Sequence, residues 1–445
     1  METGFLFLNE DDYNLKKTSR EKELQEMAKQ VLPGGVVGMS ALPENMIFIP
    51  AYGKGSKIYD VSGNEYIDYH CGSGPIILGH NFPPLTQAIK EQMEKGSHFS
   101  TVLNEPIIRL AEKIVQLIPG AEKVRFGLSG TDGTLYAIRL ARALYKKEKI
   151  LKFEGAYHGY HDYALMSNHR TKKLYDFPKP EPASSGIPEG VINSVLVAPY
   201  NNIEMTESII KKYQDQLAAV IVEPYQRSIK PKPGFLKDLR AITNKYGICL
   251  IFDEVVTGFR MALGGAQEFY GVQADLTVIG KGLGNGYPVS AVCGSSKMLE
   301  HYNPTTGTLD YAFQTGTLNG NPISAVAGLT VIQALQKPGI YERWRRMSEN
   351  LRQGLREIFK RYGVACQVVG DDAPFWHTEF TDQEIVDFRS SLTSDKSKLL
   401  KFECELMKHG IFAVPGNGKK YISAVHTDED IQKTLEICEK IISKF

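Results

Sequence analysis

One lysine stands where a side chain could do covalent chemistry. The apolar run Leu276–Ile279 is typical of a buried strand of a parallel sheet, and it leads directly into Gly280-Lys281-Gly282. Glycines let the backbone approach a bulky group, and strand ends are where open α/β sheets bind ligands. A lysine so placed could form a Schiff base with a carbonyl cofactor such as pyridoxal phosphate. The alternative is a solvated lysine in a glycine-rich turn, as most lysines are solvated.

Two further strand ends offer groups that this cofactor needs. Asp253 follows the apolar residues Ile251 and Phe252, where its carboxylate could raise the pKa of the cofactor's ring nitrogen. A carboxylate that caps the next helix is an equally good interpretation of Asp253. The segment Ser129-Gly130-Thr131 follows a strand and opens a helix. Backbone N–H groups at a helix N-terminus bind anions, so this segment is a candidate phosphate site.

Two more strand ends could contact the cofactor ring. Tyr157 and His158 follow the apolar run Ile150–Phe153, so either could lie against the ring or belong to the core. Glu223 ends the run Val220–Val222, where an unpaired charge is rare, and offers a second polar contact. Each signal is ambiguous alone. Suitable groups at five strand ends together favour a pyridoxal phosphate site.

The elements that must position these groups alternate between strands and helices. Amphipathic helices are predicted between some of the strands. The alternation predicts an α/β fold with a mostly parallel seven-stranded sheet and helices on both faces. The predicted strands are Val124–Leu128, Ile150–Phe153, Val195–Ala198, Ala219–Val222, Ile248–Phe252, Leu276–Ile279 and Val289–Cys293.

The length of 445 residues is too great for one compact core. We expect an N-terminal arm and hairpin segment over 1–90, a large cofactor-binding α/β domain over 91–335, and a small C-terminal α+β domain over 336–445. The polar, proline-rich segment 167–190 shows no periodicity. A loop of that length is usually functional or mobile.

Composition excludes several classes of function. Lys and Arg number 52 against 51 Asp and Glu, so neither nucleic acid nor an anionic membrane is an expected partner. No apolar run approaches the ~20 residues that span a bilayer, and the first residues do not resemble a secretory signal. The six cysteines form no CxxC pair, which argues against a disulfide framework or a metal site. We expect a soluble, cytoplasmic protein.

Together these motifs resemble the signature series of class III, fold-type I pyridoxal-phosphate aminotransferases. The likeness covers nearly the whole chain from about Pro33, and it is closest to the glutamate-1-semialdehyde 2,1-aminomutase branch. The segments that carry it are Leu128-Ser-Gly-Thr131, Tyr157-His-Gly159, Val222-Glu-Pro224, Phe252-Asp-Glu-Val255, Gly280-Lys-Gly282 and Gly316-Thr317.

The resemblance implies roles for individual residues. Lys281 would carry the cofactor and move a proton, Asp253 would keep the ring protonated, and Tyr157 would pack on the ring. It also implies a homodimer in which Thr317 reaches the cofactor phosphate of the neighbouring subunit. The implied cofactor-binding residues are Ser129, Gly130, Thr131, Tyr157, His158, Glu223, Asp253, Val255, Lys281, Gly316 and Thr317.

The chain departs from the aminomutase pattern at positions that would select the substrate. The arginine expected soon after Pro33 is absent, and Ser73 replaces the tryptophan expected before Gly74. The stretch Pro415–Tyr421 lacks both the glutamate of aminomutases and the arginine with which many class III enzymes bind an α-carboxylate. These departures argue against glutamate-1-semialdehyde as the substrate.

Other cations could meet an anionic substrate. Lys419, Lys420 and the basic segment 169–173 are candidates, although two solvated surface patches are the expected interpretation. The leading hypothesis is an aminotransferase that acts on small molecules, a donor amino acid and an unidentified carbonyl acceptor. An aminomutase or racemase with the same cofactor is the alternative. A cofactor-binding protein without catalysis is a third, against which Lys281 and Asp253 count.

Overall fold

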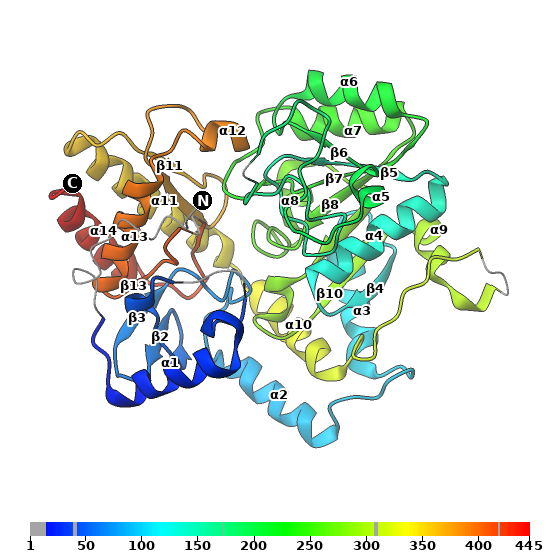
Figure 1. The fold of residues 1–445 in the computed structure, drawn as a ribbon. Coiled ribbons are helices and arrows are strands. Elements are labelled where there is room, and N and C mark those ends of the chain that lie inside the picture. Colours follow the sequence, from blue (N-terminus) through cyan, green and yellow to red (C-terminus); the bar gives the residue numbers. More distant parts are fainter. Residues whose placement is uncertain (1–14, 39–41, 172, 307–309, 417–418) are drawn as a thin grey trace. The chain divides into compact units, whose positions relative to one another are not determined.

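A computed structural model describes residues 15–38, 42–171, 173–306, 310–416 and 419–445. The chain divides into two compact units (Figure 1). The large unit consists of Pro83–Tyr341 and Ile385–Ser391. The small unit consists of Met1–Phe82, Glu342–Glu384 and Leu392–Phe445. Every candidate cofactor residue lies in the large unit.

A seven-stranded sheet forms the centre of the large unit, in the order β4-β10-β9-β8-β7-β5-β6. β10 is antiparallel to both of its neighbours, and the other neighbouring strands run parallel. The predicted α/β fold with a mostly parallel seven-stranded sheet is therefore confirmed. The strands are β4 (Lys123–Gly127), β5 (Lys149–Phe153), β6 (Val195–Ala198), β7 (Leu217–Val222), β8 (Cys249–Glu254), β9 (Leu276–Ile279) and β10 (Ser290–Gly294).

Helices cover both faces of this sheet because its central strands are apolar on both sides. In β8, Leu250 and Phe252 join a core cluster with α6 (Ile203–Tyr213) and α7 (Phe235–Lys245). Ile251 joins the cluster that contains α4 (Gly130–Tyr145). Each fully buried Leu, Ile or Phe side chain stabilises the fold by about 1.5–3 kcal/mol. The well-packed sheet therefore holds the loops at its strand ends in position.

The remaining helices of the large unit lie before, between and after the strands of this sheet. α10 packs against both α2 and α3. The side chain of Asn104 caps α3 and also donates from Nδ2 to the carbonyl of Gly320, 2.9 Å away. The helices are α2 (Pro83–Lys95), α3 (Glu105–Leu117), α5 (Glu189–Ile192), α8 (Gly265–Tyr270), α9 (Ser296–Leu299), α10 (Pro322–Leu335) and α12 (Phe388–Ser391).

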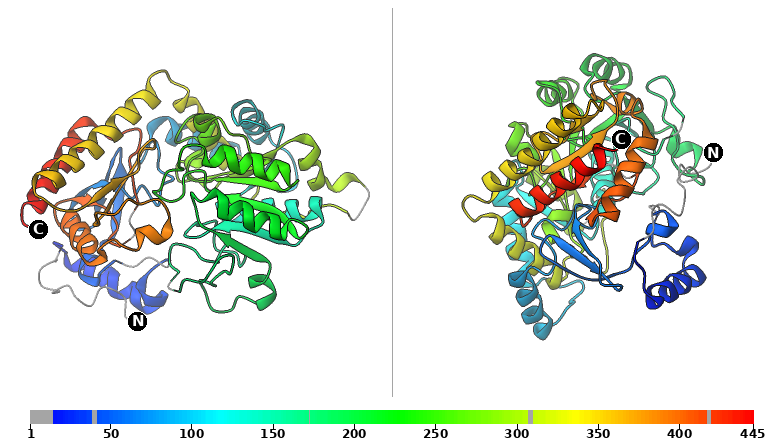
Figure 2. Two further views of the ribbon diagram at one scale, coloured as in Figure 1. Left: turned by 90° about the horizontal axis from the view of Figure 1, so that it is seen from above. Right: turned by 90° about the vertical axis from the view of Figure 1, so that its left-hand side faces the viewer.

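The small unit contains two sheets, ordered β1-β2-β3-β13 and β11-β12-β14. β2 and β3 pair antiparallel as a hairpin within the segment 1–90, whereas β1, β12 and β13 are not predicted by the sequence. Figure 2 shows α11 beside α14, where Gly354 lies against Leu435. The elements are β1 (Pro50–Lys54), β2 (Lys57–Asp60), β3 (Glu65–Asp68), β11 (Gln367–Val369), β12 (Phe375–Glu379), β13 (Ile411–Phe412), β14 (Lys420–Tyr421), α1 (Ser19–Val31), α11 (Ile340–Arg361), α13 (Lys396–Lys408) and α14 (Asp428–Ile442).

Within the described ranges, no helix has the length and apolar character that crossing a membrane requires.

Candidate active site

Lys281 follows β9 in an unusual backbone conformation. Gly280 is extended, and Lys281 has a φ of +43°, in the left-handed region that non-glycine residues rarely adopt. Such residues cluster at functional sites, where the surrounding structure holds them. The side chain is partly exposed. The conformation therefore directs a lysine out of the sheet instead of into the core.

The electrostatic surroundings of Lys281 favour its neutral amine. Burial lowers the pKa of Lys281 to about 8, and the positive charge of Arg227 lowers it further, while Asp253 and Glu223 act in the opposite direction. A neutral amine is the nucleophilic form that attacks a carbonyl carbon. Near neutral pH a useful fraction of Lys281 is in that form.

Asp253 and His158 form a buried pair. Nδ1 of His158 lies 2.7 Å from Oδ2 of Asp253, and the backbone N–H of Val255 donates to Oδ1 over 3.1 Å. Both side chains are almost fully buried, and Nε2 of His158 has no hydrogen-bond partner among the described residues. A carboxylate offers about four acceptor positions. Asp253 therefore has capacity for one more donor, such as a protonated ring nitrogen.

The neighbouring Glu254 takes the helix-capping role that the sequence left open for Asp253. Its carboxylate accepts the backbone N–H of Ala266 at 2.5 Å and that of Gln267 at 3.0 Å, in the first turn of α8. The hydroxyl of Thr257 donates to it as well, over 2.8 Å. Burial raises the pKa of Glu254 to about 7. Successive side chains of a strand point to opposite sides, so Asp253 points away from this helix cap. Its carboxylate is therefore available for the ring nitrogen of the cofactor.

Glu223 connects two backbone segments of the site. The N–H of Tyr157 donates to Oε1 of Glu223 at 2.8 Å, and the N–H of Arg227 donates to Oε2 at 3.3 Å. Sequence reasoning proposed a ring contact for Glu223 and did not single out Arg227. The only sequence signal for Arg227 is its place four residues beyond this strand-end carboxylate.

The N-terminus of α4 presents free backbone donors. Ser129 and Asp132 form a capping box, with Oγ of Ser129 accepting the N–H of Asp132 at 3.2 Å and Oδ2 of Asp132 accepting the N–H of Ser129 at 2.9 Å. The N–H groups of Gly130 and Thr131 have no acceptor among the described residues. Unpaired donors in the first turn of a helix bind anions. The residues present therefore fit a phosphate group.

Close backbone packing brings the predicted segments together around this cradle. A Cβ on Gly130 would lie 2.7 Å from Cγ1 of Val255, and one on Gly159 would lie 2.6 Å from Oγ1 of Thr131. The hydroxyl of Thr134 donates to the carbonyl of His158 at 2.6 Å. No larger residue fits at either glycine without displacing a neighbour. The segments after β4, β5 and β8 thus meet, as predicted for strand ends of one sheet.

Tyr157 is half-buried beside the loop that follows it. Its ring packs edge-on against His169, with 5.7 Å between the ring centroids. Burial raises the pKa of Tyr157. The tyrosine is therefore neutral at physiological pH and offers an apolar ring face.

Gly316 and Thr317 lie in a segment that is anchored to the large unit just before them. The hydroxyl of Tyr136 donates to the carbonyl of Thr315 at 3.0 Å, and Nε2 of Gln314 donates to the carbonyl of Phe126 at 2.8 Å. Thr317 itself is exposed and makes no hydrogen bond with the described residues. It is not joined to the Lys281 site by any such contact.

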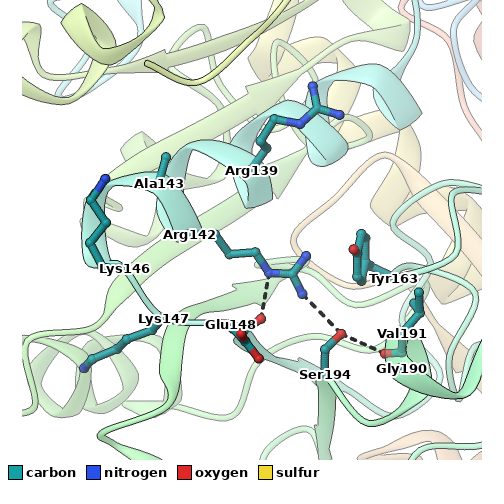
Figure 3. A pocket seen from close by; sticks show the side chains of 10 residues that line it. All are labelled: Arg139, Arg142, Ala143, Lys146, Lys147, Glu148, Tyr163, Gly190, Val191 and Ser194. Atoms are coloured by element: carbon teal, nitrogen blue, oxygen red, sulfur yellow. Dashed lines mark hydrogen bonds between the residues drawn. The ribbon is translucent and has the colours of Figure 1, made fainter. Parts of the chain in front are cut away.

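A pocket of about 560 Å³ lies at the C-terminal end of α4 (Figure 3). It is rich in cations, but they are already engaged: Arg142 donates to the carbonyl of Glu148 at 2.7 Å and to Oγ of Ser194 at 3.3 Å, and it stacks on Tyr163. The pocket residues of α4 begin at Arg139, nine residues after Gly130, so the pocket lies about 14 Å or more from the anion cradle along the helix. It is a structural cavity, and the reactive groups lie elsewhere.

Lys419 and Lys420 of the small unit are buried, so their interpretation as solvated surface cations is wrong. Nζ of Lys420 lies 2.6 Å from Oε1 of Glu403, and Nζ of Lys419 lies 3.8 Å from the ring centroid of Phe375. In the part of the chain that the structure describes, no three His, Cys, Asp or Glu side chains are grouped to hold a metal ion.

Comparison with known proteins identifies the family. The sequence profile described as "Aminotransferase class-III" matches residues 39–442. The chain belongs to the class III aminotransferases. It is 39% identical over 436 residues to the glutamate-1-semialdehyde 2,1-aminomutase of Thermodesulfovibrio yellowstonii, with 96% of this chain and 100% of that protein covered.

Solved structures agree with this membership. An omega-transaminase from Sphaerobacter thermophilus is 34% identical, with a TM-score of 0.90 over 96% of this chain and 98% of that one. A transaminase with PLP bound is 27% identical, with a TM-score of 0.87 over 97% of this chain and 98% of that one. The predicted fold-type I architecture, the pyridoxal phosphate cofactor and the assignment as an enzyme of this family are confirmed.

Proposed function

We propose that this class III enzyme is a cytoplasmic aminotransferase that moves an amino group between a donor amino acid and a carbonyl substrate. The observation that supports it most is the surroundings of Lys281. Its amine has a pKa lowered to about 8 by burial, and no described residue accepts a hydrogen bond from it. A reactive amine thus lies in the same unit as a buried Asp253–His158 pair and an anion cradle.

The residues present suit each part of the cofactor. The unpaired N–H groups of Gly130 and Thr131 would hold the phosphate, and Asp253 would bind the ring nitrogen. Val255 and the half-buried ring of Tyr157 would bound the ring. When bound, pyridoxal phosphate supplies a protonated aromatic ring that accepts the electron pair released when the substrate loses its α-proton.

The protein groups then divide the remaining tasks. His158 and the N–H of Val255 hold the carboxyl group of Asp253 in place, and a carboxylate beside the ring nitrogen would keep that nitrogen protonated. Lys281, once free of the cofactor, takes the α-proton with its neutral amine and returns it from the resulting ammonium. A base whose pKa lies close to the working pH suits both directions of this transfer.

A second copy of the chain would complete the site. Thr317 is exposed, and so are large apolar side chains beside it, Leu318 (48%), and just before α3, Val102 (67%) and Leu103 (80%). The hydrogen bond from Asn104 to the carbonyl of Gly320 joins the two segments that carry them. We therefore propose a homodimer in which Thr317 reaches the partner's cofactor phosphate. Light scattering should give twice the chain mass for the wild type, and Leu103→Asp should lower it, whereas a wild-type monomer would contradict the dimer.

A half-reaction tests the transfer of the amino group. The holoenzyme, mixed with glutamate or alanine and no acceptor, should convert its cofactor to the amine form and release one equivalent of the keto acid. Absorbance follows the cofactor, and a coupled dehydrogenase measures the keto acid. No keto acid from any donor in an amino acid panel would contradict the proposal.

The aminomutase is the second candidate, since a curated relative with 39% identity carries that name. An aminomutase would isomerise glutamate-1-semialdehyde without releasing a keto acid. Conversion of that compound at a rate above every transamination would favour this candidate over an aminotransferase.

A further inference from the structure

Arg227 lies in a tight turn that follows β7. The N–H of Ile229 donates to the carbonyl of Gln226 at 2.8 Å and closes the turn. Arg227 has a φ of +54°, in the left-handed region that costs a non-glycine residue roughly 1–2 kcal/mol. The side-chain amide of Gln226 fixes the turn by donating to the carbonyl of Glu154 at 2.7 Å. A strained residue held by its surroundings is typical of a functional position.

The turn is built onto the active site through one buried carboxylate. Glu223 accepts the N–H of Arg227 with one oxygen and the N–H of Tyr157 with the other. The backbone of Arg227 is therefore fixed relative to the residue that precedes His158 and its partner Asp253. The side chain of Arg227 is therefore attached to backbone that is held in a fixed position beside the reactive groups.

The guanidinium of Arg227 is without a partner in the part of the chain that the structure describes. It is partly exposed, and no hydrogen bond, ion pair or ring contact joins it to a described residue. By contrast, Arg389 of the large unit pairs with Glu154, and Lys152 donates to backbone carbonyls. The nearby carboxylates are engaged too, Glu223 with two N–H groups and Asp253 with His158.

The charge of Arg227 nevertheless acts on the reactive groups. After burial, it has the largest effect on the pKa values of Lys281, Tyr157 and His169, and it lowers all three. The positive charge of Arg227 favours the neutral form of the Lys281 amine. The same cation attracts an anion that arrives with the substrate.

We propose that Arg227 binds a carboxylate of the substrate, so that the enzyme acts on amines and carbonyl compounds that carry one. This inference rests on the proposed function and specifies its substrate class. The planar guanidinium binds a carboxylate through two parallel N–H···O bonds, a geometry that a lysine cannot reproduce. Arg227 is thus a specificity-determining residue beside Lys281.

Matched amines test the inference. Two pairs differ only by a carboxylate: 3-aminobutanoate with 2-aminopropane, and alanine with ethylamine. Single-turnover conversion of the cofactor gives kcat/KM for each amine with the wild type, Arg227→Gln, Arg227→Lys and the control Lys230→Gln, an exposed cation of the same loop. For Arg227→Gln we expect a loss of about 10- to 100-fold with the carboxylate amines and less than about twofold with the others. Arg227→Lys should recover little.

Binding gives a readout that is independent of turnover. Calorimetry of butanoate with the holoenzyme should show a similarly weakened Kd in Arg227→Gln, while cofactor retention on dialysis is unchanged. Equal losses for both members of a pair together with weaker cofactor retention would overturn the inference, because Arg227 would then serve the cofactor phosphate. Unchanged amine ratios would overturn it too. If the wild type converts no amine, the proposed function fails, and butanoate affinity alone decides the role of Arg227.

Discussion

Two lysines of the large unit have similarly lowered pKa values but opposite surroundings. Burial lowers the pKa of Lys281 to about 8 and that of Lys152 to about 7. Lys152 lies in β5 with no exposed surface, and its amine donates to three backbone carbonyls, those of Ala156 (3.1 Å), Ala164 (3.4 Å) and Met166. Lys281 is partly exposed and donates to no described residue.

The difference separates a structural amine from a reactive one. A lowered pKa reports loss of hydration, which both lysines have undergone. Lys152 has exchanged water for carbonyl oxygens and connects β5 to the loop after it. Lys281 has lost water without gaining a partner among the described residues, so its lone pair remains available. For these two amines, hydrogen bonding decides which can react.

Replacement of Lys281 should have the largest effect. Lys281→Ala removes both the covalent anchor and the base, so we expect turnover to fall by about 10³- to 10⁴-fold. The absorbance of the lysine-bound cofactor should disappear, while circular dichroism stays native. Lys152→Met is the matched control and should retain that absorbance. Lysine-bound absorbance in Lys281→Ala would show that another amine is the reactive one.

Two adjacent carboxylates of β8, Asp253 and Glu254, allow a second comparison between a reactive and a structural group. Asp253→Asn leaves the ring nitrogen without a counter-charge, and we expect kcat to fall by about 10²- to 10³-fold. Glu254→Gln, the adjacent residue with its carboxylate in the α8 cap, should instead lower the melting temperature and leave the cofactor spectrum unchanged. Steady-state kinetics and thermal melts on both variants measure this. Equal loss of kcat in the two variants would contradict the division of roles.

The sequence predicts the sheet well because its strands are continuous apolar runs such as Leu217–Val222. It does not predict β12, since His377 and Glu379 within Phe375–Glu379 look like surface residues. Their side chains pair with each other at 3.0 Å inside the small unit. Nor does it predict β1, whose proline and glycine are typical of a turn but tolerated on an exposed edge strand.

The sequence predicts which strand ends carry the residues of the site, but it does not predict how their side chains pair. Parallel strands bring their C-terminal ends to one edge, so Asp253 and His158 could be expected to be neighbours. Their direct pairing depends on side-chain directions across 95 residues of sequence. Arg227 escaped notice because its turn is held in place by a tertiary hydrogen bond from Gln226 to the carbonyl of Glu154, which the sequence does not reveal.

Lys152→Met should have a moderate effect on stability. Three carbonyl oxygens lose their donor, which costs about 1–3 kcal/mol in the free energy of unfolding. The pH dependence gives a more specific signature. The unfolded amine stays protonated to about pH 10.4, whereas the folded one loses its proton near pH 7. Between these values the unfolded state binds more protons, so Lys152 makes stability rise with pH. Urea unfolding of the cofactor-free protein from pH 7 to 10 should show a shallower rise in Lys152→Met, and an unchanged slope would mean that Lys152 is not the titrating group.

The last prediction concerns the protonation state of the Lys281 amine, and its expected effect is the smallest. Only the neutral amine captures the cofactor's aldehyde, so the capture rate of the cofactor-free enzyme should fall about tenfold for each pH unit below the pKa of about 8. Stopped-flow absorbance after addition of pyridoxal phosphate measures the profile. Lys152→Met should leave its midpoint unchanged. Arg227→Gln should raise the midpoint, because the charge of Arg227 opposes protonation of Lys281. A rate that still increases beyond pH 10 in the wild type would mean that Lys281 behaves as an ordinary solvated amine, and the contrast between the two lysines would then rest on exposure alone.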